Sequence, residues 1–110
     1  MIHQSKFNSF LLRLLPVAKY TIVGTSMLPA LKPGDTVLVN KLAYLFSPPK
    51  IGEIVILKDP RDKRIIIKRI EKIENGLYSV RGDNKKASTD SLEYGMLKKK
   101  NIIGKVIYKL

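Results

Sequence analysis

Short apolar runs bounded by Gly, Pro, Asn and Asp make up most of the chain after its N-terminal stretch. Such runs are typical of β-strands, and their regular spacing is typical of a coiled sheet or small barrel. The predicted strands cover residues 20–23, 36–41, 53–58, 64–73, 77–81 and 102–108. The pattern therefore predicts an all-β fold, a small coiled antiparallel sheet or partly open barrel of about six strands.

The residues between these runs predict how the strands connect. Asn75-Gly76 readily adopts the positive φ angles of a type I′ turn, so it predicts a tight hairpin between the fourth and fifth strands. The Pro-rich segment 43–49 is predicted to be a loop. The third run, 53–58, is almost continuously apolar and is therefore predicted to be buried on both faces.

The N-terminal segment has a helical pattern. Residues 10–18 are mostly apolar, but Arg13 and Pro16 interrupt them, and they fall far short of the ~20 residues of a membrane-spanning helix. We expect a short amphipathic helix instead. Its apolar face is formed by Leu11, Leu14 and Leu15. Packing of this face against the protein is favoured, and contact with a bilayer surface is the alternative.

A strong positive charge narrows the choice of partners. Lys and Arg number 21 against 9 Asp and Glu, which gives a formal net charge of +12. This balance favours nucleic acid, acidic lipid headgroups or acidic peptides, although basic residues scattered along the chain fit a solvated surface equally well. The chain has no cysteine and one histidine, His3, so we expect no thiol nucleophile, disulfide, metal site or cofactor.

Ser26 is the first candidate for chemistry. It lies in the segment 24–31, Gly-Thr-Ser-Met-Leu-Pro-Ala-Leu, directly after a predicted strand. A tight turn here would lift the hydroxyl from the sheet and free backbone N–H groups, which can stabilise the oxyanion formed when a peptide carbonyl is attacked. The alternative is a serine that simply caps the turn.

Lys68 is the second candidate. Alternation along the predicted strand 64–73 puts Ile66, Lys68 and Ile70 on one face. Desolvation between two isoleucines would lower the pKa of the Lys68 amine, as a lysine general base requires. The alternative is a lysine at the edge of the sheet whose amine reaches water.

A polar loop at 82–91 supplies the remaining candidates. Gly-Asp-Asn at 82–84 predicts a turn, and hydroxyl groups and a carboxylate cluster after it. In a hydrolase, Ser88 could orient the lysine amine and Asp90 could anchor the loop. The alternative is an ordinary solvent-exposed loop.

These segments form an ordered series of motifs. Residues 26–31 read Ser-Met-Leu-Pro-Ala-Leu, and residues 52–56 read Gly-Glu followed by three apolar residues. Residues 67–70 read Ile-Lys-Arg-Ile, and Gly-Asp-Asn-x-x-x-Ser-x-Asp-Ser follows at 82–91. In this order the motifs resemble those of the type I signal peptidase family. The resemblance implies a serine endopeptidase with a Ser/Lys dyad on a signal-peptidase-like core.

The resemblance also implies individual roles. Ser26 would be the nucleophile, Lys68 the general base and Ser88 the residue that positions the Lys68 amine, with Asp90 in support. The Ser26 amide is the implied oxyanion donor. Because a glycine stands two residues before the nucleophile, where some members have serine, the Thr25 hydroxyl is a second candidate donor. The active-site loops would contain Met27, Pro29, Gly82, Asp83 and Asn84.

Departures from the family pattern indicate a compact member. No Gly-x-Pro-Gly-Asp segment follows the lysine motif, the large inserted β-domain is missing, and Leu92 stands where many members have arginine. With Lys-Asp-Pro-Arg at 58–61, the chain resembles the nickel-type superoxide dismutase maturation proteases. That resemblance implies removal of a leader so that the new N-terminus can bind nickel. We expect a tail with a short helix over 1–18 and one catalytic domain over 19–110, without a spanning helix.

A general signal peptidase is the alternative within the same family. Residues 7–18 and the basic surface would then hold the protein peripherally at the cytoplasmic membrane, whereas a maturation protease would be cytoplasmic. In both cases the partner is a precursor protein with an N-terminal leader or signal peptide.

Two other classes fit less well. A self-cleaving repressor domain would also use a Ser/Lys dyad, but neither an Ala-Gly or Cys-Gly cleavage site nor a DNA-binding half is found. A basic nucleic-acid-binding β-domain fits the charge, but the three Phe and five Tyr lack the paired spacing of a base-stacking surface. We therefore expect no nucleic-acid partner.

Overall fold

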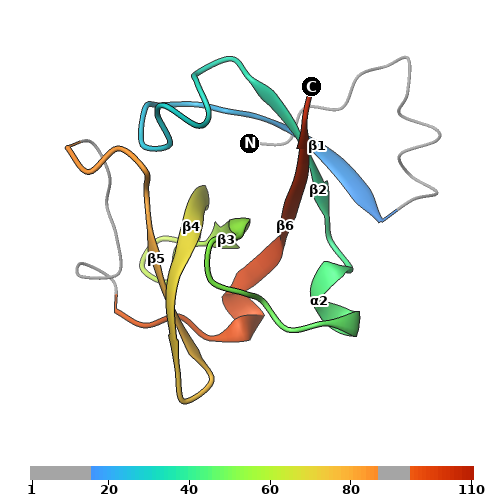
Figure 1. Cartoon of the computed structure of the whole chain (residues 1–110), viewed down its shortest axis with the longest axis vertical. Coiled ribbons are helices and arrows are strands. Elements are labelled where there is room, and N and C mark those ends of the chain that lie inside the picture. Colours follow the sequence, from blue (N-terminus) through green and yellow to red (C-terminus); the bar gives the residue numbers. More distant parts are fainter. Residues whose placement is uncertain (1–15, 87–94) are drawn as a thin grey trace.

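The part of the chain that the computed structural model describes, residues 16–86 and 95–110, folds into six strands. They are β1 (Val17–Thr21), β2 (Thr36–Asn40), β3 (Ile54–Lys58), β4 (Ile65–Glu74), β5 (Leu77–Arg81) and β6 (Ile102–Lys109). The strands pair antiparallel in one sheet, in the order β1-β2-β6-β3-β4-β5 (Figure 1). This sheet is open, with β1 and β5 at its ends. The all-β prediction is confirmed.

The last strand in chain order lies in the middle of the sheet. β6 pairs with β2 on one side and with β3 on the other. Gly104 makes this close pairing feasible, because a Cβ atom there would lie 2.7 Å from Val39 Cγ1 and 2.8 Å from the Asn40 carbonyl oxygen. A larger residue would therefore force β6 away from β2.

The apolar side chains form two clusters. One contains Tyr20, Met27 and Ile56, and the other contains Val55 and Leu57. Since successive side chains of a strand point to opposite faces, β3 contributes to both clusters and all three of its central residues are buried. The predicted burial of this strand on both faces is confirmed.

The first strand is displaced relative to its prediction. β1 begins at Val17 and ends at Thr21, whereas residues 20–23 were predicted. The observed bounds follow from pairing with β2, which extends from Val17 opposite Asn40 to Thr21 opposite Thr36. Ile22 continues this pairing beyond the strand. Its amide donates to the Asp35 carbonyl at 2.8 Å, and its own carbonyl accepts from the Gly34 amide at 2.9 Å.

The connections agree with the prediction at the hairpin and differ from it at 43–49. Asn75 and Gly76 have φ angles of 51° and 75°, as the predicted type I′ turn requires. The predicted loop, in contrast, contains a single helical turn, α2 (Ala43–Phe46). It follows a side-chain hydrogen bond from the Leu42 amide to Asn40 Oδ1 at 2.9 Å.

Within the described residues, a second helical element is the short 3₁₀ helix η1 (Lys99–Asn101). Across residues 16–86 and 95–110, no helix is long and apolar enough to cross a bilayer. The predicted N-terminal amphipathic helix lies outside the described residues.

Candidate active site

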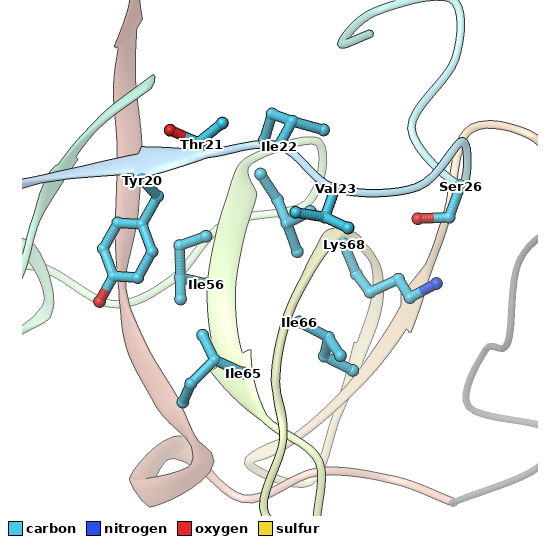
Figure 2. A pocket seen from close by; sticks show the side chains of 10 residues that line it. Tyr20, Thr21, Ile22, Val23, Ser26, Ile56, Ile65, Ile66 and Lys68 are labelled. Carbon is cyan, nitrogen blue, oxygen red and sulfur yellow. The ribbon is translucent and has the colours of Figure 1, made fainter. Parts of the chain in front are cut away.

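Ser26 and Lys68, which are far apart in the sequence, line the same pocket. This pocket has a volume of about 130 Å³. One wall comes from the end of β1 and the residues after it, 20–23, and the other from the first residues of β4, 65–67. Figure 2 shows the Lys68 amine and the Ser26 hydroxyl directed toward one another at one end of the pocket. The fold thus brings together the two residues that were predicted to form a dyad.

The Lys68 side chain is buried. Only 4% of its surface is exposed, and the residue pairs with Val55 of β3 in the interior of the sheet. Ile66 and Ile70, its neighbours along the strand face, both pack in the second apolar cluster. The alternative of an edge lysine that extends to water is therefore wrong. Burial disfavours the charged ammonium form and thus favours the neutral amine. The neutral amine is the form of lysine that can accept a proton.

The turn that carries Ser26 is anchored by the residue after it. Met27 is 1% exposed and packs in the first apolar cluster together with Leu31. The Leu31 amide donates to the Met27 carbonyl at 2.9 Å, and the Leu28 amide donates to the Thr25 carbonyl at 3.2 Å. Ser26 is left half-buried at the rim of the pocket. Among the residues that the structure describes, the Ser26 amide donates no hydrogen bond.

The other predicted residues of this turn face solvent. Thr25 and Pro29 are both exposed, and the peptide bond between Leu28 and Pro29 is cis.

The loop after β5 holds the Ser26 turn from the other side. The Asn84 amide donates to the Ser26 carbonyl at 2.8 Å, and Asn84 Nδ2 donates to the Thr25 carbonyl at 3.1 Å. Of the predicted loop residues 82–84, Asn84 is thus in direct contact with the Ser26 turn. One asparagine fixes two consecutive peptide groups there.

Arg69 fixes this loop in turn, and it was not among the predicted site residues. Its Nε and Nη2 atoms donate to the two Asp83 carboxylate oxygens at 2.8 and 2.7 Å. Hydrogen bonding to Asp83 raises the pKa of the Arg69 guanidinium, although its partial burial acts in the opposite direction. Arg69 Nη1 also donates to the Gly52 carbonyl at 2.8 Å. We call Arg69, Asp83 and Asn84 the clamp of the Ser26 turn.

The β4–β5 hairpin could have indicated the ion pair between Arg69 and Asp83. The β4–β5 register places Arg69 opposite Arg81, so the residues that follow Arg81 must lie beside Arg69. An acidic residue two positions further on is then a natural partner. The motif at residues 52–56 is also bound to β4 next to Arg69, because the Gly52 amide donates to the Ile70 carbonyl at 2.8 Å.

Two of the predicted residues lie outside the described part of the chain. Ser88 and Asp90 both fall within residues 87–94. Their predicted roles stay predictions.

Comparison with known proteins gives the family. A family model described as signal peptidase, peptidase S26, matches residues 5–71 and 70–110. The chain belongs to the signal peptidase family. The resemblance drawn from the motifs is thereby confirmed.

Individual relatives of this signal peptidase family chain come from several sources. A probable signal peptidase I-1 of Synechocystis sp. is 25% identical over 146 residues, which cover 92% of this chain and 74% of the relative. The mitochondrial ATP-independent inner membrane protease subunit 1a of Arabidopsis thaliana is 32% identical over 111 residues, 79% of this chain and 66% of the relative. Signal peptidase I of Aquifex aeolicus is 48% identical over 52 residues, 46% of this chain and 20% of the relative.

Membership of the signal peptidase family settles the class of the protein. It is a serine-type peptide hydrolase, and the alternative of a basic nucleic-acid-binding domain is not supported. The matches cover between 20% and 74% of the length of the three relatives above.

Proposed function

We propose that this protein is a Ser/Lys endopeptidase that removes an N-terminal leader peptide from a precursor protein. One observation carries the proposal. A buried lysine amine and a serine hydroxyl are directed toward one another in one pocket of a signal peptidase family member. A serine hydroxyl needs an adjacent base to become nucleophilic, and the neutral lysine amine is such a base.

In each half-reaction of this mechanism, the Lys68 amine first accepts a proton and then donates it. Its neutral amine accepts the Ser26 Oγ proton while Oγ attacks the scissile carbonyl carbon. The Lys68 ammonium then returns the proton to the leaving amine as the C–N bond breaks, which leaves an acyl ester on Ser26. Water, deprotonated by Lys68, attacks this ester, and Ser26 regains its proton as the cleaved leader departs as a carboxylic acid.

The oxyanion of both tetrahedral intermediates would be held by the Ser26 amide. This group donates no hydrogen bond within the described residues. A donor aimed at the oxyanion is typically worth about 3–4 kcal/mol of transition-state stabilisation. The Thr25 hydroxyl is the second candidate donor, Ser88 would orient the Lys68 amine and Asp90 would support the loop, as the family resemblance implies.

The leader would bind in extended form along the pocket. Residues 22–23 leave β1 at one wall and β4 begins at the other, so a peptide between them can add main-chain hydrogen bonds as an extra strand. The volume of about 130 Å³ and the isoleucines that line the pocket favour small apolar side chains next to the cleaved bond.

The clamp predicts that Arg69 positions the nucleophile. Replacing Arg69 by Lys keeps the charge but removes the two-point contact with Asp83, so the loop and the Ser26 turn lose their common anchor. We expect kcat to fall about tenfold to hundredfold, as misplacement of a reacting group by about 1 Å does, with a smaller change in KM. The measurement is steady-state kinetics on a leader peptide.

Two controls separate positioning from stability. Arg64→Lys alters a comparable pair, since Arg64 Nε lies 2.7 Å from Asp62 Oδ2, but it is exposed and outside the pocket. It should leave kcat unchanged. Thermal unfolding of Arg69→Lys shows whether the folded fraction is intact at the assay temperature. A kcat equal to that of the wild type would contradict a positioning role.

The finer identity of the substrate is a proposal that rests on sequence resemblance. Segments 58–61 and 82–91 resemble those of nickel-type superoxide dismutase maturation proteases, which favours the precursor of that enzyme as the substrate. The relatives that are named signal peptidase I favour the alternative, a general signal peptidase at the membrane surface.

One experiment distinguishes the two substrates. The intact mass of a nickel superoxide dismutase precursor is measured after incubation with the protein, in parallel with a precursor that carries a secretory signal peptide. We expect loss of the leader from the first precursor only. Cleavage of the second alone would support the general signal peptidase, and an unchanged mass of both would contradict the proposed leader peptidase.

A further inference from the structure

The helical turn α2 exposes large apolar side chains to solvent. Leu45 is 71% exposed and Phe46 is 87% exposed, and Leu42 and Ile51 close to them in sequence are exposed as well. Tyr44 alone of this turn is buried and fixes it to the body of the protein. Single exposed apolar residues are common on soluble proteins, but several together indicate a contact surface. Leu42, Leu45 and Phe46 are spaced by three and four residues and therefore share one side of the turn, and we call these three residues the α2 ridge.

Three lysines lie on one side of this ridge, next to Leu45. A hollow of about 380 Å³ beside Leu45 is lined by Lys41, Lys99 and Lys100. The lysines at 99 and 100 come from η1, which is far from α2 in sequence, so the fold itself creates the cluster. All three lysines are exposed. The hollow is thus apolar on the side of α2 and positively charged at its rim.

The carboxylate on the inner side of α2 does not cancel this charge. Glu53 accepts a hydrogen bond from the Tyr44 hydroxyl at 2.8 Å, and its other oxygen lies 2.8 Å from the Lys105 amine. Its charge is already balanced by Lys105. The lysines beside the ridge therefore keep a net positive potential toward solvent.

The N-terminal segment joins the fold beside the same surface. The Lys41 amide donates to the Pro16 carbonyl at 2.8 Å, so the first described residue lies next to the start of α2. The fifteen residues before it are rich in Phe and Leu and carry Lys6 and Arg13. The described part of the chain thus begins beside the α2 ridge.

We propose that the α2 ridge docks on a lipid bilayer that contains anionic headgroups. The ridge enters the boundary between headgroups and acyl chains, and the lysines of the hollow bind headgroup phosphates. Large apolar side chains on one face of a helix with flanking lysines are the arrangement that interfacial helices use. The inference does not depend on the Ser/Lys chemistry.

A fluorescent reporter tests the position of the ridge directly. The chain has no tryptophan, so Phe46→Trp gives a single indole at the tip of the ridge. Tyr108→Trp is the matched control, since Tyr108 is 61% exposed at the far end of β6. With vesicles of phosphatidylcholine and phosphatidylglycerol, we expect a blue shift and quenching by brominated lipid for Phe46→Trp only, and weaker binding as salt rises. Phosphatidylcholine vesicles alone should bind weakly.

Two double variants test the components of the surface by vesicle co-sedimentation. Leu45→Ser/Phe46→Ser should weaken partitioning about tenfold or more, because both side chains leave water in the docked state. Lys99→Gln/Lys100→Gln should weaken it roughly thirtyfold at low salt. Lys32→Gln/Lys72→Gln removes the same charge elsewhere and should have a clearly smaller effect. Circular dichroism checks that each variant is folded.

Several results would overturn the proposal. They are an unshifted Phe46→Trp spectrum with anionic vesicles, equal quenching at both reporter positions, or equal losses in the two lysine pairs. A concentration-dependent blue shift of Phe46→Trp without lipid would assign the ridge to a second copy of the chain instead. Peptide cleavage is measured separately in detergent-free buffer, so failure of membrane docking and failure of the peptidase proposal are distinguishable.

Discussion

Replacing Ser26 by Ala is expected to abolish peptide cleavage while the protein remains folded. The substitution removes one hydroxyl from a half-buried position at the pocket rim, and Met27 still anchors the turn. Loss of a nucleophile typically lowers kcat by a factor on the order of 10³ to 10⁶. The measurement is cleavage of a leader peptide at saturating substrate, together with the thermal unfolding midpoint.

A matched serine controls for nonspecific effects. Ser47 is exposed and its hydroxyl donates weakly to the Ala43 carbonyl at 3.4 Å, away from the pocket. Ser47→Ala should cleave like the wild type. Residual activity of Ser26→Ala above a few per cent would show that another group attacks the peptide bond.

Replacing Lys68 by Ala is expected to have an effect of the same size, because the hydroxyl of Ser26 then has no base. Lys68→Met separates chemistry from packing, since methionine fills much of the same volume at a site that is 4% exposed. Both variants should be inactive, whereas only Lys68→Ala should lose thermal stability through a cavity. Lys68→Arg should also be inactive, because arginine remains protonated.

The pH dependence gives the direction of the proton transfer. The base acts as the neutral amine, so activity should rise with pH, about tenfold per unit, until Lys68 is deprotonated and then level off. The rate is measured as kcat/KM on a substrate whose own groups do not titrate in this range. A profile that is flat from mildly acidic to alkaline pH, or an active Lys68→Met variant, would contradict the dyad.

Local patterns predicted much of the fold. The hairpin at Asn75-Gly76 depends on two residues that favour positive φ, so the sequence determines it locally. Alternation placed Lys68 between two isoleucines, but the sequence left its burial open, because the pairing of β4 with β3 decides it. The position of β1 was missed because its extent is decided by pairing with β2. The partner strand lies beyond a connection of fourteen residues, 22–35, so the pairing cannot be inferred from residues 17–21 alone.

Contacts between distant residues could not be predicted from local patterns. Asn84 Nδ2 and the Thr25 carbonyl are 59 positions apart, and only the folded sheet brings them to 3.1 Å. The α2 turn was expected to be a loop because prolines follow it, but Tyr44 packs into the core and holds the turn in place. The exposure of Phe46 could not be predicted from the hydrophobic pattern either, because an apolar residue between strands can pack in the core or face solvent.

The central place of β6 in the sheet has a consequence for folding during synthesis. β1, which leads into the Ser26 turn, and β4, which carries Lys68, belong to opposite halves of the sheet. β6 joins these halves by pairing with both β2 and β3. Residues 102–109 are synthesised after every other strand. Until residues 102–109 have left the ribosomal exit tunnel, the two halves of the sheet therefore lack the strand that joins them, and Ser26 and Lys68 cannot be brought together.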